Sequence, residues 1–239
     1  MEWIALVWVA LAAVGLLYLG RRFEGRTAGK RNPAIALNLR YQPLSLVLAV
    51  LLLVAIWATT GVSPQRWLGA GNLSAPATDL AWLGVTQTDT WATVGALFAV
   101  IMTVVTGITL WIQVAKPNGL VLRALPRFLW IAVAVALVNS LVEELIFRVA
   151  VIQALEATWP AVAISAASAV LFGVPHYFGK PGGPVGVLLA GFMGWLLTAS
   201  ILQTGGIGWA WFIHFVLDVV ILVMVFAAAA KTPSPKPAN

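Results

Sequence analysis

The sequence contains no cysteine, and only 9% of its residues are charged. The absence of cysteine excludes disulfides, zinc–thiolate sites and thiol nucleophiles, and it leaves the redox compartment unreadable. Soluble domains carry roughly 25% charged residues. A surface that faces water cannot be built from so few charges, so most of the surface of this chain must face lipid.

Hydrophobic residues, by contrast, make up 61% of the 239 residues. A transmembrane helix needs about 20 consecutive and mostly apolar residues. The sequence therefore predicts an all-α fold, a polytopic bundle of about seven transmembrane helices that forms one integral membrane domain over residues 1–239. The predicted spans cover residues 3–20, 44–60, 91–114, 128–155, 161–178, 185–202 and 209–230.

The distribution of basic residues predicts the orientation of the bundle. The first span has no basic segment before it and a basic cluster after it, which indicates an anchor rather than a signal peptide. If seven spans alternate, nearly all the basic residues fall on one side, and Arg66 alone falls on the other. The basic side carries Arg21, Arg22, Arg26, Lys30, Arg31, Arg40, Lys116, Arg123, Arg127, Lys180, Lys231 and Lys236. The positive-inside rule then predicts a multi-pass protein of the cell membrane, with its N-terminus outside and its C-terminus in the cytoplasm. The net charge of +6 is explained by these loops, so no nucleic-acid partner is expected.

Three other segments have readable composition. Residues 61–90 are rich in Gly, Ser, Thr and Pro and predict an external loop, with a short or re-entrant segment near 75–85 as the alternative. The tail 231–239 contains three prolines and predicts disorder. Gly186, Ala190 and Gly194 are spaced by four residues, which favours close helix packing.

Six ionisable residues lie inside the predicted spans, where each costs roughly 2.5–3.5 kcal/mol on insertion scales. They are Glu143, Glu144, Arg148, His176, His214 and Asp218. The two histidines are the only ones in the chain. Scattered structural use would not place both of them inside spans, so these residues are candidates for a functional site.

Helical spacing groups these residues within each span. Glu144 and Arg148 are four residues apart, in the favourable order for an ion pair. Glu143 lies about 100° around the helix and is therefore expected to face a different neighbour. Asn139 lies one turn before Glu143 and can hydrogen-bond near it.

Two further spans carry matching pairs. His214 and Asp218 are four residues apart and share a helix face, and Phe172 and His176 repeat this spacing. A carboxylate shielded from water can act as a general base, and an imidazole can bind metal, move a proton or donate to an oxyanion. Two imidazoles with one or two carboxylates also make a set suited to Zn²⁺, in which Glu143, His176, His214 and Asp218 would be the ligands.

Other interpretations of these residues exist. They can form a satisfied polar network, with Glu144–Arg148 as a structural pair and Phe172 as packing. Ionisable residues in spans also mark ion paths, so a proton-coupled transporter is an alternative. A non-catalytic membrane scaffold or immunity protein is another.

The three groups of residues resemble the motifs of a known family. Glu143-Glu144-Leu145-Ile146-Phe147-Arg148 is similar to the EExxxR motif of the CAAX-protease and bacteriocin-processing (CPBP) family. The segment from Phe172 to His176 is similar to its FxxxH motif, and the segment from His214 to Asp218 to its HxxxN/D motif. The motifs occur in the family's order, and the resemblance covers about residues 128–230.

This resemblance implies an intramembrane endopeptidase with a catalytic core at about 128–230. Its substrate would be a membrane-associated or lipid-anchored protein or peptide, and its partners would be that substrate and the lipid bilayer. Glu143 would activate water with help from His176, while His214 and Asp218 would stabilise the oxyanion or help to hold a metal. Glu144 and Arg148 would brace the site. Asp218 stands where relatives typically have Asn, and a charged Asp is a poor oxyanion donor, so Asp218 would have to be protonated, bind a metal or orient His214.

Overall fold

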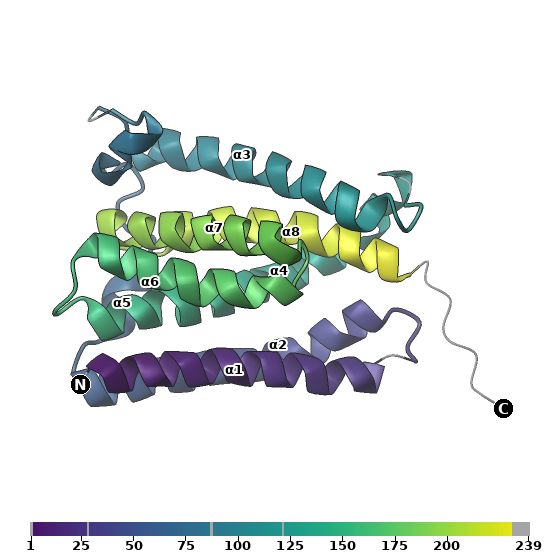
Figure 1. The fold of residues 1–239 in the computed structure, drawn as a ribbon, viewed down its shortest axis with the longest axis horizontal. Helices are drawn as coiled ribbons and strands as arrows, with labels where there is room; N and C mark the ends of the chain where they lie inside the picture. Colours follow the sequence, from purple (N-terminus) through teal and green to yellow (C-terminus); the bar gives the residue numbers. More distant parts are fainter. Residues whose placement is uncertain (1, 28, 87, 121, 231–239) are drawn as a thin grey trace.

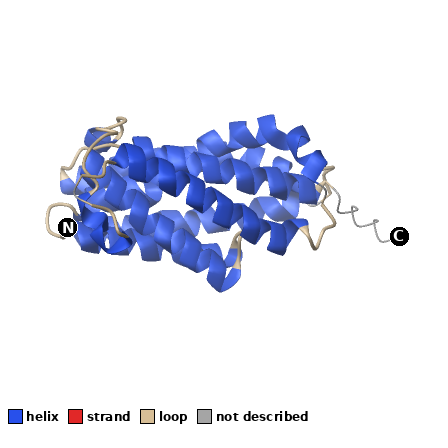
Figure 2. Cartoon of the chain, turned by 90° about the horizontal axis from the view of Figure 1, so that it is seen from above, coloured by secondary structure: helices blue, strands red, loops and turns tan. Residues whose placement is uncertain are grey.

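The computed structural model describes residues 2–27, 29–86, 88–120 and 122–230. These described residues form helices and no β-strand (Figure 2). The α-helices are α1 (Glu2–Thr27), α2 (Pro33–Thr60), α3 (Trp91–Leu110), α4 (Leu129–Glu144), α5 (Ala150–Leu155), α6 (Ala161–Gly173), α7 (Gly183–Thr204) and α8 (Gly208–Ala229). Short 3₁₀ or π-helical segments are η1 (Pro64–Trp67), η2 (Thr78–Leu83), η3 (Trp111–Ala115), η4 (Leu122–Phe128), η5 (Leu145–Val149) and η6 (Val174–Phe178).

Seven helical segments of the described chain are long and apolar enough to cross a membrane. The predicted all-α bundle of about seven helices is therefore confirmed. The fourth span is a composite that runs from η4 through α4 and η5 to α5, and η6 completes the fifth. The tail 231–239, which was predicted to be disordered, lies outside the described residues.

The helices lie nearly side by side along one long direction (Figure 1). The pair α1 and α2 lies on one side of a central group made of α4 to α8, and α3 lies on the other side. Within the bundle, α6 packs on α7, and α8 packs on both α3 and α4. The connections α1–α2 and α3–α4 lie at one end, and the α6–α7 turn stops short of that end.

The prediction of a loop between spans one and two is wrong, because most of these residues are helical. Helix α1 continues to Thr27, and α2 already begins at Pro33. Asn32 caps α2 by accepting a hydrogen bond from the N–H of Ile35 at 3.2 Å, and proline is well suited to the first helical position. The long arginine side chains of this region can extend towards water while the backbone stays helical, so polarity does not mark the end of the helix.

The segment 61–90, which was predicted to be an external loop, also contains more structure than a simple loop. It forms η1 and η2 and an isolated bridge between Pro76 and Thr90. Leu80 in η2 is fully buried, so this segment packs on the bundle without adding a span. The N–H of Ile207 lies 3.0 Å from the carbonyl of Trp67 and 2.9 Å from that of Gly69, which fixes the start of α8.

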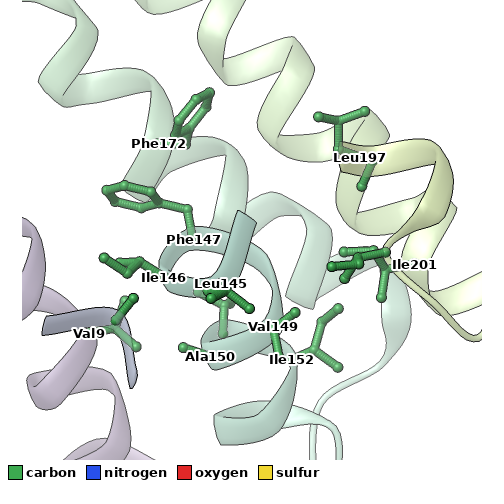
Figure 3. Close-up of a cluster of buried hydrophobic side chains, with 14 of the residues drawn as sticks. Val9, Leu145, Ile146, Phe147, Val149, Ala150, Ile152, Phe172, Leu197 and Ile201 are labelled. Carbon is green, nitrogen blue, oxygen red and sulfur yellow. The ribbon is translucent and has the colours of Figure 1, made fainter. Parts of the chain in front are cut away.

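The core is continuous through the fourth span. Residues of η5 and α5 are buried against α1, α6 and α7, as Figure 3 shows for Val9, Phe147, Phe172 and Leu197. Close packing at Gly194 is also confirmed. A Cβ atom on Gly194 would lie 2.8 Å from the backbone of Ala169 on α6, so the two helices pass at a separation that only glycine permits here.

Candidate active site

The two adjacent glutamates at the end of α4 have different environments. The side chain of Glu144 is fully buried, whereas that of Glu143 is 20% exposed. Glu144 Oε1 lies 2.6 Å from Nδ1 of His214 and 3.4 Å from Nη1 of Arg148. The π-helical turn η5 follows directly, and such turns occur frequently at functional sites.

The imidazole of His214 lies among three carboxylates. Its Nδ1 faces Glu144, while its Nε2 lies 3.4 Å from Oε2 of Glu143 and 3.7 Å from Oδ1 of Asp218. As its place on the helix predicted, Glu143 faces a neighbour other than Arg148, but that neighbour, His214, also contacts Glu144. Both glutamates contact the same ring, because the imidazole lies between their side chains and presents one nitrogen to each.

Asn139 connects the carboxylates on the side away from Arg148. Its Nδ2 donates to Oε1 of Glu143 at 3.2 Å and to Oδ2 of Asp218 at 2.9 Å. Helices α4 and α8 are thus joined through one amide and one imidazole. Hydrogen bonds in such a network restrict each other's geometry, because each donor has a defined acceptor.

His176 enters the site from a different backbone conformation. Helix α6 ends at Gly173, and η6 follows with Pro175, which has no N–H to continue the helical ladder. Nδ1 of His176 lies 2.6 Å from the carbonyl oxygen of Phe172. Because a carbonyl can only accept, Nδ1 is the donor, and Nε2 remains for another partner.

Phe172 is the aromatic centre of the site. It is buried, and its ring centroid lies 4.4 Å from that of His176 and 5.6 Å from that of His214. The guanidinium carbon of Arg148 lies 3.8 Å from the same ring. Arg148 is fully buried, so this cation–π contact and Glu144 are its principal stabilising neighbours in the described structure.

Two cavities reach this site, and Glu143 and His176 line both. One has a volume of about 200 Å³, lies among α3, α4, α7 and α8, and extends to Lys180 in the α6–α7 turn. The other has a volume of about 390 Å³ and lies between α1, α2 and η6. His214 and Asp218 line the first cavity only. Glu143 is therefore accessible from two sides, whereas Glu144 lines neither.

The described side chains do not form a metal site as they are placed. No group of three or more histidine, aspartate or glutamate side chains in the described part of the chain is arranged to hold a metal ion. Nε2 of His214 lies near the oxygens of Glu143 and Asp218, and Nδ1 lies near Glu144, so carboxylate oxygens surround both ring nitrogens. The sequence-based zinc site thus stays a prediction, and the chemistry below is derived from the side chains alone.

Comparison with known proteins adds one finding. Residues 125–220 match the family model described as type II CAAX prenyl endopeptidase Rce1-like. This part of the chain is therefore similar to the CAAX-protease family. The resemblance found in the motifs is thereby confirmed, and the CAAX-protease match contains every candidate site residue. No curated protein and no solved structure matches the chain.

The similarity to the CAAX-protease family and the seven spans together support an intramembrane endopeptidase. The match does not extend to α1, α2 and α3, yet these helices line the cavities. Sequence reasoning missed Gln42 of α2, whose Nε2 lies 2.7 Å from Oδ1 of Asn139. A signal was present, because Asn38, Gln42 and Ser45 recur with helical spacing just before and inside the predicted second span.

Proposed function

We propose that this protein hydrolyses a peptide bond in a membrane-associated or lipid-anchored protein or peptide, with water activated by Glu143. The observation that carries the proposal is the difference between the two glutamates. Glu143 reaches both cavities and lies beside His214, whereas Glu144 is fully buried between His214 and Arg148. A general base must be within reach of the proton that it removes, and Glu143 meets this requirement.

The proposed reaction uses Glu143 twice and each histidine once. Water in the cavity hydrogen-bonds to Glu143 and to Nε2 of His176, and Glu143 accepts a proton as the water oxygen bonds to the scissile carbonyl carbon. His214 donates from Nε2 to the oxyanion that forms. Glu143 then returns the proton to the leaving nitrogen as the C–N bond breaks.

Asp218 and Glu144 act on His214 in this scheme. Asp218 accepts a hydrogen bond from Asn139, and in this scheme it acts as an acceptor and not as an oxyanion donor. Asp218 and Glu144 lie near opposite nitrogens of His214. They therefore hold the ring in place and favour the form in which Nε2 carries a hydrogen that it can donate. Arg148 holds Glu144 in turn.

Substitution of Glu143 tests the proposal. Glu143→Gln keeps the size and the hydrogen bond from Asn139 but cannot accept a proton, so cleavage of a membrane-peptide pool by the purified protein should fall about 10²- to 10⁴-fold. The melting temperature should change little. Glu156→Gln, which makes the same chemical change at a residue that pairs with Arg66 and lines neither cavity, is the control and should cleave normally. Turnover that survives Glu143→Gln contradicts the assignment of the base.

Elemental analysis of the detergent-purified protein tests the predicted zinc. If the sequence-based site is correct, the wild type carries about one zinc per chain, and the double variant His176→Ala/His214→Ala loses it. Cleavage that depends on Glu143 in protein free of zinc contradicts the metal site while leaving the proposed base in place.

A further inference from the structure

Helix α2 places one buried amide against the candidate active site, although α2 lies outside the CAAX-protease match. The side chain belongs to Gln42, and the residue is only 5% exposed. Its Nε2 donates to Oδ1 of Asn139 at 2.7 Å. A buried amide in a membrane span is costly unless its partners are in place, so this contact needs an explanation.

The contact determines which way round the Asn139 amide stands. An amide has one oxygen that accepts and one nitrogen that donates. With Oδ1 held by Gln42, Nδ2 is directed at Glu143 and Asp218 and can give one hydrogen to each. The reversed amide would place Oδ1 against two carboxylates and Nδ2 against the Nε2 of Gln42, so both sides would become repulsive.

Gln42 is itself held in one orientation. Its Nε2 also lies 3.4 Å from Oδ1 of Asn38, and its Oε1 accepts from Oγ of Ser45 at 3.4 Å. Ser45 is fully buried, and the single hydrogen of its hydroxyl is shared between this Oε1 and the backbone carbonyl of Gln42, which lies nearer, at 2.9 Å. Donors and acceptors therefore alternate consistently from α2 to α4 and α8.

We propose that Gln42 is a positioning residue of the active site, which fixes the Asn139 amide so that Glu143 and Asp218 each keep a hydrogen-bond donor. The proposal rests on the proposed function for its effect on catalysis. Gln42 lines neither cavity, so it acts through Asn139 and not on the substrate. Helix α2 thereby contributes to the reaction from outside the CAAX-protease match.

Two substitutions at Gln42 separate positioning from packing. Gln42→Glu keeps the shape but replaces the donor by an acceptor, which turns Asn139 away from the carboxylates. Gln42→Leu removes the donor and leaves Oδ1 of Asn139 unpaired. We expect Gln42→Glu to lower kcat about 10- to 100-fold, the range known for outer-shell partners in metalloenzymes, with KM nearly unchanged. Gln42→Leu should lower kcat less.

Gln153 provides the matched control. It is equally buried, but its Nε2 donates to the backbone carbonyl of Val62, remote from the carboxylates. Gln153→Glu and Gln153→Leu should lower the melting temperature at least as much as the Gln42 variants while kcat is retained. If kcat falls in proportion to the melting temperature equally at Gln42 and Gln153, the proposal is overturned. A folded Gln42→Glu variant with normal kcat also overturns it.

A readout without turnover keeps this test independent of the proposed function. The chain has two histidines, so NMR signals of labelled histidine can be assigned with His176→Ala. Gln42→Glu should shift the His214 signals, because Glu143 and Asp218 move, and Gln153→Glu should leave them in place. Unshifted His214 signals in Gln42→Glu overturn the positioning role. If Gln42→Glu shows these shifts but the wild type cleaves no peptide, the proposed function alone is contradicted.

Discussion

Arg148 lies fully buried between the carboxylate of Glu144 and the ring of Phe172. A buried ion pair is costly to form, but removal of one partner leaves an uncompensated charge. Substitution of Arg148 therefore tests whether this residue stabilises the site without taking part in the reaction.

Arg148→Ala should destabilise the protein by about 3–5 kcal/mol, the range for breaking a buried pair, because Glu144 loses its guanidinium and Phe172 loses its stacked neighbour. Thermal unfolding in detergent measures this loss. Arg66→Ala is the control, since it breaks an exposed pair with Glu156 in which the Arg66 side chain is 71% exposed, and such pairs contribute little. An Arg148→Ala variant that is as stable and active as the wild type refutes the bracing role.

At this scale, helical spacing predicted the pairs within one helix. Glu144–Arg148 and His214–Asp218 are both present as i,i+4 pairs. Contacts between helices were out of reach, because His214–Glu144 and Gln42–Asn139 join residues 70 and 97 positions apart. Their geometry depends on how far each helix slides along its neighbour, which a single sequence does not specify.

Among the elements, α6 and α7 make the closest packing described above. Gly194 of α7 faces the backbone of Ser168 and Ala169 on α6, so no side chain can retreat from an added methyl group. Since η6 and His176 continue directly from α6, the position of this imidazole depends on that packing.

Gly194→Ala should therefore destabilise the protein by about 1–3 kcal/mol, the typical cost of overpacking, and should lower cleavage through His176. Gly191→Ala on the same helix is the control, because its Cβ would lie 3.5 Å from the carbonyl oxygen of Ala169, an ordinary contact. Thermal unfolding of the two variants compares them directly, and equal melting temperatures contradict the close approach.

The number of spans followed from hydrophobicity, but the limits of α1 and α2 did not. Charged residues in 21–40 indicated a loop, whereas the helices continue through most of it. Apolar length reports how much of a helix lies in hydrocarbon, and the backbone remains helical beyond that depth.

For the whole molecule, the ends of the bundle differ in charge, and this predicts orientation. Because the chain has no cysteine, single cysteines can report on each end without a background. In sealed, right-side-out vesicles, an impermeant maleimide should label Arg66→Cys at once and Lys116→Cys only after permeabilisation. The reverse pattern contradicts the predicted outside N-terminus.

Because Glu143 and His176 line both cavities, two reactants can reach these side chains by separate routes. Hydrolysis inside a bilayer needs two reactants of opposite solubility, one that arrives through lipid and one that arrives from water. If only one cavity reached the carboxylate, both reactants would have to pass through that cavity one after the other. Because a cavity reaches Glu143 from each side, water can stay in contact with the carboxylate on one side while a peptide chain is bound on the other.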